Sequence, residues 1–349
     1  MKRELVALVG ANISGGPITL VGEVDWQEIY TLAAAQGVLA MVLDAVALLP
    51  QEQQPSKELK MRWIASTMAI ERRYNHQRSV SATLAERFAQ RGISLYVLKG
   101  LALAGYYPRP EHRECGDLDC FLGAEYERGN QVAEELGAKV ARDYYKHSHI
   151  HLQKLLIENH QFCMGIRGSR KLKAFERHLE SIISKGATNI EDTQLIKPSA
   201  DFNALFLTAH AMTHFLVEGI KLRHLCDWAL FLKHEQHNIN WDEFYYWSDK
   251  LGYTLFANTM TAMAVDALGV EITNPDIRVD RRYAERILED MFKSNNIFNK
   301  GYSPWRVRLM TIVGRVSSIW RFHRVYRKSL LGHLLRQAYG FIFEPRPRL

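Results

Sequence analysis

Cysteine is scarce in this sequence, with four residues among 349, and their spacing gives them no joint role. No CxxC pair occurs, so a zinc ribbon is excluded, and the spacings suggest no disulfide framework. We therefore expect free thiols in a reducing cytoplasm at Cys115, Cys120, Cys163 and Cys226. With 47% hydrophobic and 24% charged residues, the composition is that of an ordinary globular protein.

Long hydrophobic runs are also missing. The apolar stretches at 32–49 and 205–216 are interrupted by polar residues and are too short for a membrane span. At the N-terminus, Glu4 breaks the apolar run and no convincing small-residue cleavage site follows. We therefore expect no signal peptide and a cytoplasmic location.

The excess of positive charge is confined to one end of the chain. Residues 300–349 contain eleven of the 45 Lys and Arg residues and one of the 38 acids, a net charge of +10, so the preceding 299 residues carry −3. The basic segment mixes arginine with tryptophan, tyrosine and leucine. This pattern is consistent with an amphipathic helix on an anionic membrane surface, with a nucleic-acid partner, and with a helix packed on the domain. Membrane contact, and hence a membrane-peripheral location, is favoured over nucleic acid.

The pattern along the chain divides it into four segments. Residues 1–90 form an N-terminal helical region, because apolar residues recur at three- and four-residue spacing. Residues 91–197 form an α/β core, with the predicted order strand, helix, strand, helix, strand, strand. Residues 198–299 are again helical, and residues 300–349 are the basic amphipathic tail. The fold class is therefore predicted as α+β, with a small mixed-sheet core flanked by helical regions.

Two carboxylates form the first candidate site. Asp117 and Asp119 lie two residues apart on a predicted strand, so their side chains project from the same face. Like charges held together in a poorly solvated site repel, and a divalent cation relieves that repulsion. Hard oxygen ligands suit Mg²⁺. An Asp-x-Asp pair on its own is also common in solvated turns.

Cationic residues precede this pair. A β-rich run ends in Lys99-Gly100, and a strand-to-helix turn with glycine presents backbone N–H groups to phosphate. Arg109 and Arg113 follow in a proline-containing loop and are candidates for two-point binding of phosphate oxygens. Phosphate-binding cations beside a metal site are the components that phosphoryl or nucleotidyl transfer requires.

These motifs resemble a known family. LKGLALAGYYP, followed by an arginine and GDLDCFL, resembles the signature of the uncharacterised nucleotidyltransferases, which are similar to the polymerase-β nucleotidyltransferase superfamily. Ile157-Glu158-Asn159-His160 resembles a later strand of that family. The segment 210–232 resembles its helices with a His-x-x-x-His pair. The resemblance covers roughly residues 26–232.

The resemblance implies a nucleotidyltransferase core and a set of site residues. Glu158 is the implied third carboxylate beside Asp117 and Asp119, with Mg²⁺ (or Mn²⁺) as the metal and an NTP as the substrate. In the implied two-metal reaction, Lys99 and Arg113 neutralise phosphate charge. The NMP group passes to an unidentified acceptor hydroxyl or phosphate.

The turn departs from the superfamily pattern. Members usually have Gly-Ser or Gly-Gly there, whereas this sequence has Lys99-Gly100-Leu101 and no hydroxyl to contact the triphosphate. This departure motivates one alternative, a catalytically inactive nucleotidyltransferase-fold protein that binds or scaffolds. A second alternative is a toxin-like nucleotidyltransferase acting on tRNA or protein. The base, the acceptor and the oligomeric state do not follow from the sequence.

Two groups of histidines complete the candidates. His147, His149 and His151 alternate on one face of a predicted strand, and His210 and His214 have i, i+4 spacing on a predicted helix. Packing or hydrogen bonding is the favoured role for both groups, and substrate binding is the alternative for the helical pair.

We also expect Asp227 to be a buried partner of Arg223 or His210.

Overall fold

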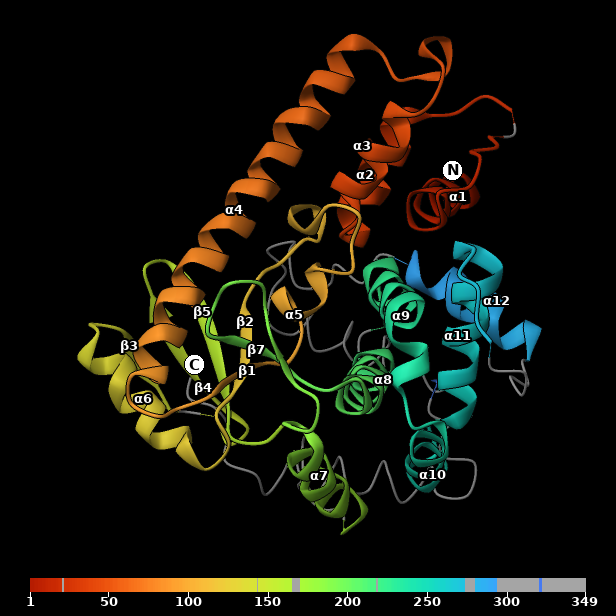
Figure 1. The fold of residues 1–349 in the computed structure, drawn as a ribbon. Coiled ribbons are helices and arrows are strands. Elements are labelled where there is room, and N and C mark those ends of the chain that lie inside the picture. The colour runs from red at the N-terminus through yellow and green to blue at the C-terminus, as the bar shows by residue number, and fades with distance from the viewer. Residues whose placement is uncertain are drawn as a thin grey trace, which may run out of the picture.

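The computed structural model describes residues 1–20, 22–142, 144–164, 170–217, 219–273, 280–293 and 320–321. The fold is α+β, as predicted, with one mixed sheet flanked by helices from both ends of the chain (Figure 1). Within the described ranges, no helix combines the length and the apolar character needed to cross a membrane. The four cysteines are buried and free.

The N-terminal region is helical, with bounds α1 Lys2–Ser14, α2 Trp26–Gln36, α3 Leu39–Ala47 and α4 Lys57–Ala89. Gly37 separates α2 from α3, because its φ of 69° lies in the left-handed region that ends a helix. The 33-residue α4 begins where the Ser56 hydroxyl accepts a hydrogen bond from the backbone N–H of Leu59. It runs from the N-terminal helices to the sheet (Figure 1).

The sheet has seven strands in the order β3-β4-β5-β2-β1-β7-β6. Their bounds are β1 Leu95–Val97, β2 Leu118–Phe121, β3 Lys139–Ala141, β4 His147–Leu152, β5 Leu155–His160, β6 Thr188–Asn189 and β7 Leu195–Lys197. β2 pairs with β5 and β1 with β7 in parallel, while the other neighbours are antiparallel. β3, β6 and β7 lie outside the predicted strand order because each has only two or three residues and lacks the buried apolar run that marks the equally short β1.

The two faces of the sheet differ in chemistry. Leu118 and Cys120 of β2 and Ile157 of β5 join an apolar cluster with residues of α4 and of α6 (Tyr126–Glu135). Because side chains alternate along a strand, Asp119 and Glu158 project from the opposite face. The hydrophobic effect thus orients both strands and presents the carboxylates away from this cluster.

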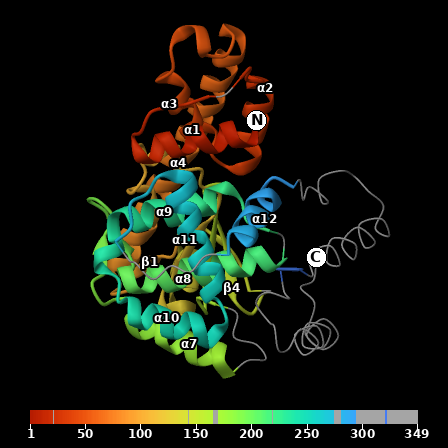
Figure 2. The ribbon, with the colours of Figure 1, turned by 90° about the vertical axis from the view of Figure 1, so that its right-hand side faces the viewer.

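A helix outside the predicted order, α7 Arg170–Ile182, lies between β5 and β6, and the C-terminal region that follows the sheet is helical, with bounds α8 Ala200–Val217, α9 Leu222–Glu235, α10 Trp241–Leu251, α11 Thr254–Leu268 and α12 Arg281–Met291. α1 packs across this region against α11 (Figure 2). A Cβ on Gly10 would lie 2.9 Å from the Ala267 carbonyl oxygen, so the close approach of the two helices depends on glycine there.

The basic tail, 300–349, lies outside the described residues apart from Trp320 and Arg321. The Arg321 guanidinium is buried and lies 2.6 Å from an Asp290 carboxylate oxygen and 3.0 Å from the Phe215 carbonyl oxygen. The Trp320 ring packs against Phe215 and Tyr283. The predicted membrane and nucleic-acid contacts fall on the undescribed part of this segment.

Candidate functional site

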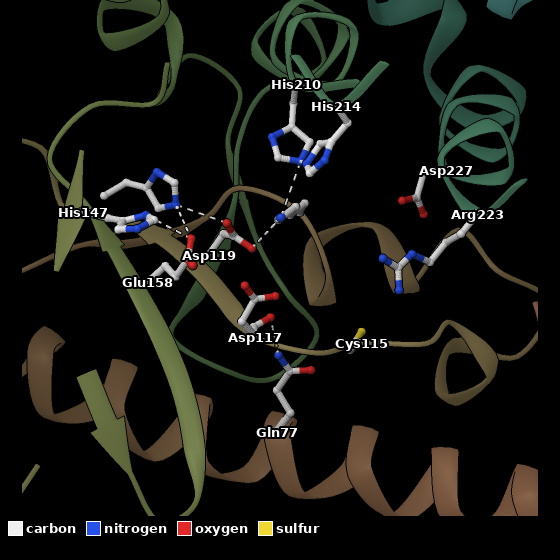
Figure 3. A network of polar contacts seen from close by, with 12 residues as sticks. Gln77, Cys115, Asp117, Asp119, His147, Glu158, His210, His214, Arg223 and Asp227 are labelled. Atoms are coloured by element: carbon white, nitrogen blue, oxygen red, sulfur yellow. Dashed lines mark hydrogen bonds and ion pairs between the residues drawn. The ribbon is translucent and has the colours of Figure 1, made fainter. Parts of the chain in front are cut away.

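Asp117 and Asp119 lie at the start of β2 and line the same cavity. Asp117 is half-buried directly before the strand, where its carbonyl oxygen accepts a hydrogen bond of 2.8 Å from the Gln77 amide of α4. Asp119 lies within the strand, with 3% of its surface exposed. Figure 3 shows both carboxylates close to Glu158.

Asp119 is held between two nitrogen groups. Its Oδ2 lies 3.0 Å from Lys99 Nζ, and its Oδ1 lies 3.1 Å from His160 Nε2. Burial raises the pKa of the Asp119 carboxyl, but the charge of Lys99 and the hydrogen bond from His160 outweigh it, so the pKa lies below its ordinary value. The side chain is therefore ionised at neutral pH.

Glu158 lies next to Asp119 because their two strands are paired. Its Cα is the register partner of Asp119 across the parallel β2–β5 pair. Its Oε2 lies 3.0 Å from His147 Nδ1 and 3.5 Å from His160 Nε2. Although burial raises the pKa of the Glu158 carboxyl, His147 and His160 hold it well below the ordinary value.

The three predicted carboxylates are not equally close. Ligand atoms of Asp119, Glu158 and His160 lie within 4.8 Å of one another, and within the described ranges Asp117 belongs to no group that tight. The Asp117 carboxyl nevertheless interacts electrostatically with both Asp119 and Glu158. Burial, followed by the charges of Asp119 and Glu158, raises the pKa of its carboxyl. The two aspartates and Glu158 thus form one repelling cluster, with Asp117 at its edge.

Asn159, which interrupts the apolar pattern of β5, has a structural explanation. Its amide, on the face opposite Glu158, donates hydrogen bonds to the Tyr126 carbonyl oxygen at 3.1 Å and to Asn130 Oδ1 at 2.9 Å. The Ser148 hydroxyl lies 2.6 Å from the same Asn130 oxygen. Asn159 is fully buried, so these bonds to α6 compensate its amide N–H groups for the loss of water.

The cavity has an empty volume of about 720 Å³, open solvent included, and lies between the sheet and the C-terminal helices. Its polar end is lined by Lys99, Gly100, Asp117 and Asp119. Helices α8, α9 and α11 line the rest with six apolar side chains, namely Leu207, Ala211, Trp228, Phe256, Ala257 and Met260, and with polar side chains that include His210, Arg223 and Asp227. Cationic and apolar surfaces in one cavity fit a phosphate-bearing ligand beside a second, less polar group.

Gly100 forms the turn between β1 and the short helix α5, Leu101–Ala104. Its φ of 63° and ψ of −113° lie in a region that L side chains rarely adopt. A Cβ there would make only an ordinary contact of 3.8 Å with Arg113 Nη1, so the backbone conformation and not a lack of space requires glycine. Glycine thus permits the turn that places Lys99 at the polar end of the cavity.

Arg113 lines the cavity, but its guanidinium is paired with the carboxylate of Asp227. Its Nε and Nη2 each lie 2.9 Å from an oxygen of Asp227, and the Tyr107 hydroxyl donates to the same carboxylate at 2.6 Å. The expectation that Asp227 pairs with Arg223 or His210 was wrong. Arg223 instead donates to the Glu114 carbonyl oxygen at 3.1 Å. A buried carboxylate in direct contact with Arg113 satisfies both charges.

Arg109 lies away from the cavity lining. Its half-exposed guanidinium contacts Asp44, Glu71 and Glu111 at 3.0 to 3.6 Å. The neighbouring His112 is buried and bonds to Asp44 at 2.6 Å and to Glu71 at 2.9 Å. This cluster joins the loop before β2 to α3 and α4, so we leave Arg109 out of the proposed nucleotide site.

His112 makes the stability of this junction depend on pH. Burial alone lowers the pKa of the imidazole, but the hydrogen bonds to Asp44 and Glu71 outweigh it, so the folded-state pKa lies above 6.5. The folded chain therefore binds this proton more tightly than the unfolded chain. The stabilisation is full below the unfolded-state pKa and is lost as pH rises through the folded-state value.

We expect the loss of unfolding free energy in His112→Gln to be larger at about pH 5.5 than at about pH 8.5. Urea unfolding at the two pH values measures it. The exposed His76, bonded to the Gln153 carbonyl oxygen, offers the control His76→Gln, which should show a much smaller difference. Equal losses for His112→Gln at both pH values would contradict the proposed charge.

The helical histidines face the site. His210 lines the cavity, with Nε2 at 3.5 Å from Lys99 Nζ and 3.0 Å from His214 Nε2. Burial, Lys99 and His214 lower the pKa of His210 well below its ordinary value, so the imidazole is neutral. Figure 3 shows His210 and His214 side by side on α8, above the carboxylates. This position fits the alternative in which the helices contribute to substrate binding.

The sequence interpretation assigned no role to two residues of the site. One is His160, which contacts both Asp119 and Glu158. The other is Lys146, directly before β4. Burial lowers the pKa of its ammonium, and the nearby charges of Asp119 and Glu158 only partly offset that lowering. For His160 a signal was present, because Glu158 and His160 are two residues apart and project from one face of a strand. Lys146 precedes its strand and carried no such signal.

A glycine turn with a lysine, followed by carboxylates on two paired strands, is the arrangement of a nucleotidyltransferase-type core. The chain belongs to the family described as uncharacterised nucleotidyltransferase, whose model matches residues 22–269. The resemblance drawn from the LKG and Asp-x-Asp motifs is thereby confirmed, and the membership supports a general function in nucleotidyl transfer. No curated protein and no solved structure matches the chain.

Proposed function

We propose that this protein is a Mg²⁺-dependent nucleotidyltransferase that moves an NMP group from an NTP to an acceptor hydroxyl or phosphate. The observation that carries the proposal is the convergence of Lys99, Asp117 and Asp119 at the polar end of one cavity, with Glu158 behind Asp119. The family membership supports the same reaction class.

The donor set fits a divalent metal. Asp117, Asp119 and Glu158 supply only oxygen ligands, which suit Mg²⁺ or Mn²⁺. The raised pKa of Asp117, to which the charges of Asp119 and Glu158 contribute, indicates a repulsion that a bound cation would relieve. When bound, the metal supplies charge neutralisation for the phosphates and activation of the attacking oxygen.

The other residues position the substrates. The Lys99 ammonium, which pairs with Asp119, would move onto a phosphate oxygen when a nucleotide enters. Gly100 lets the backbone approach the phosphates without a side chain in the way. The apolar side chains that α8, α9 and α11 contribute to the cavity would hold the less polar part of the nucleotide or the acceptor.

We expect an NTP with Mg²⁺ to stabilise the wild-type protein against heat, by about 2.7 kcal/mol at a ligand concentration 100 times the dissociation constant. Thermal unfolding with each of the four common NTPs, with and without Mg²⁺, measures this. Lys99→Met should lose most of the shift, whereas Lys154→Met, on the turn between β4 and β5 outside the cavity lining, should keep it. No shift with any NTP and either Mg²⁺ or Mn²⁺ would contradict the proposal.

One observation favours a catalytically inactive binding protein. Both carboxylate oxygens of Asp119 already contact cationic or hydrogen-bonding groups, Lys99 and His160. An inactive protein would retain that pair permanently. Nucleotide binding without any transfer, together with full function of the double variant Asp117→Ala, Asp119→Ala, would establish this alternative.

A further inference from the structure

A group of histidines and a glutamate lies beside the cavity and is not part of its lining. His147 and His149 come from β4, and Glu158 comes from the adjacent β5. One ligand atom from each of the three lies within 4.8 Å of the others. Their side chains are 12%, 30% and 20% exposed, so the group is enclosed but reachable from solvent.

The backbone brings these three side chains together. His147 and His149 are two residues apart and share one face of β4, and the antiparallel register places His149 opposite Glu158. The other faces of the two strands are anchored by Ile150 and Ile157 in the apolar cluster under α6. A slip of one residue would expose that apolar face, so the register that joins the three ligands is strongly specified.

We propose that His147, His149 and Glu158 bind a divalent transition-metal ion, with Zn²⁺ as the ion that the donor set fits. Two imidazoles and one carboxylate form the ligand set of many zinc sites that keep a coordination position for water or a substrate. Imidazole nitrogen suits zinc, copper, nickel and iron, whereas Mg²⁺ takes oxygen ligands. This site therefore differs in metal preference from the all-carboxylate site, although the two share Glu158.

The two contacts of Glu158 approach the separations that tetrahedral zinc requires, and the three ligand atoms lie within 4.8 Å of one another. Ligand atoms about 2.0 to 2.2 Å from one ion lie roughly 3.3 to 3.5 Å apart. Glu158 Oε2 is 3.0 Å from His147 Nδ1, and Glu158 Oε1 is 3.8 Å from His149 Nε2. Small side-chain rotations would bring these atoms onto one ion.

His160 has a separate part in this arrangement. Its Nε2 lies between the two carboxylates, 3.1 Å from Asp119 Oδ1 and 3.5 Å from Glu158 Oε2. In the tautomer that carries the proton on this nitrogen, the N–H group orients Glu158 and stands between the zinc site and Asp119. Hydrogen bonds of this kind to a ligating carboxylate tune metal affinity.

The direct test is zinc binding by the full-length, untagged protein after removal of metal with a chelator. Competition with a chromogenic zinc indicator should show one tight site in the wild type. We expect His147→Gln and His149→Gln each to weaken it by at least about 100-fold, since losing even an outer hydrogen-bonding partner costs about 10- to 100-fold. His151→Gln is the matched control, because His151 lies on the same strand opposite Leu156 and outside the group.

Two results would overturn the site. One is unchanged zinc affinity in the double variant His147→Gln, His149→Gln, and the other is an equal loss in His151→Gln. If a glutamine variant unfolds, the absorption spectrum of wild-type protein with Co²⁺ decides. Intense bands of four- or five-coordinate Co²⁺ support the site, and the weak spectrum of hydrated Co²⁺ overturns it.

Failure of the proposed transferase function is distinguishable from failure of this site. Asp117 lies outside the histidine group, so Asp117→Asn should lose the Mg²⁺-dependent nucleotide response and keep the zinc affinity of the wild type. Zinc binding in a protein that binds no NTP would remove the proposed function and leave the metal site standing. Loss of zinc affinity in Asp117→Asn would count against a separate site.

Discussion

Replacing Asp119 by asparagine is expected to lower nucleotidyl transfer by about 100- to 1000-fold, the range found when one stabilising group is removed from an active site. The substitution keeps the shape of the side chain and removes the charge that a metal would need. Asp119 is 3% exposed and is the carboxylate in contact with both Lys99 and His160. Pyrophosphate release from NTP and Mg²⁺, in the presence of a metabolite extract that supplies acceptors, measures the effect.

The control for this prediction is a carboxylate outside the cavity. Asp192 is 89% exposed on the loop between β6 and β7, so Asp192→Asn should keep the wild-type rate. Circular dichroism and thermal unfolding establish that the Asp119→Asn chain is folded. Transfer at the wild-type rate by folded Asp119→Asn would exclude Asp119 as a metal ligand in catalysis.

Replacing Arg113 by leucine is expected to lower the free energy of unfolding by about 3 to 5 kcal/mol, the usual result of removing one partner of a buried ion pair. The side chains of Arg113 and Asp227 are only 5% and 9% exposed, and two 2.9 Å contacts join them. Without Arg113, the Asp227 carboxylate would remain buried with Tyr107 as its main hydrogen-bond donor. Urea unfolding of the two proteins measures the difference.

A double variant separates the pair from its surroundings. Arg113→Leu with Asp227→Leu should be more stable than Arg113→Leu alone, because no unpaired charge remains. Arg91, whose pair with Glu135 is 42% and 60% exposed, supplies the control, and Arg91→Leu should change stability by less than about 1 kcal/mol. Similar losses for Arg91→Leu and Arg113→Leu would show that burial of the pair is not the cause.

The Arg113 variants also bear on the expectation that Arg113 binds phosphate. If its only role is the contact with Asp227, a folded double variant should keep the thermal shift caused by NTP and Mg²⁺. If Arg113 also reaches the nucleotide, that shift should fall. The first outcome would show that the Arg113 guanidinium serves only to stabilise the fold, and the second that it also binds the nucleotide.

Strand periodicity made part of the site readable from the sequence. Alternation in β2 and β5 predicts that Asp119 shares a face with Asp117, and Glu158 with His160, because a strand sends every second side chain to the same side. The Lys99-Gly100 turn was predicted for a similar local reason, since glycine after a buried strand indicates a sharp change of direction. These features depend on residues within a few positions of one another.

Contacts between residues far apart in the sequence could not be predicted in this way. His147 and Glu158 meet because β4 and β5 pair in one register, and Arg113 meets Asp227 across 114 positions of the chain. The sequence indicated Arg223 or His210 for Asp227, since these are the nearest suitable groups along the chain or on the neighbouring helix. The cation that contacts Asp227 is set by the packing of α9 against the loop before β2. The local sequence pattern does not predict that packing.

By itself, then, the sequence determined the α+β class and the shared face of Asp117 and Asp119, because these follow from local periodicity, and the resemblance of its motifs to a known family indicated Glu158 and the family itself. Tertiary structure alone decided that Glu158 faces histidines as well as Asp119, and that α8, α9 and α11 line one cavity together with Lys99. The physical reason is that strand pairing and helix packing are set by the burial of apolar surface over the whole chain.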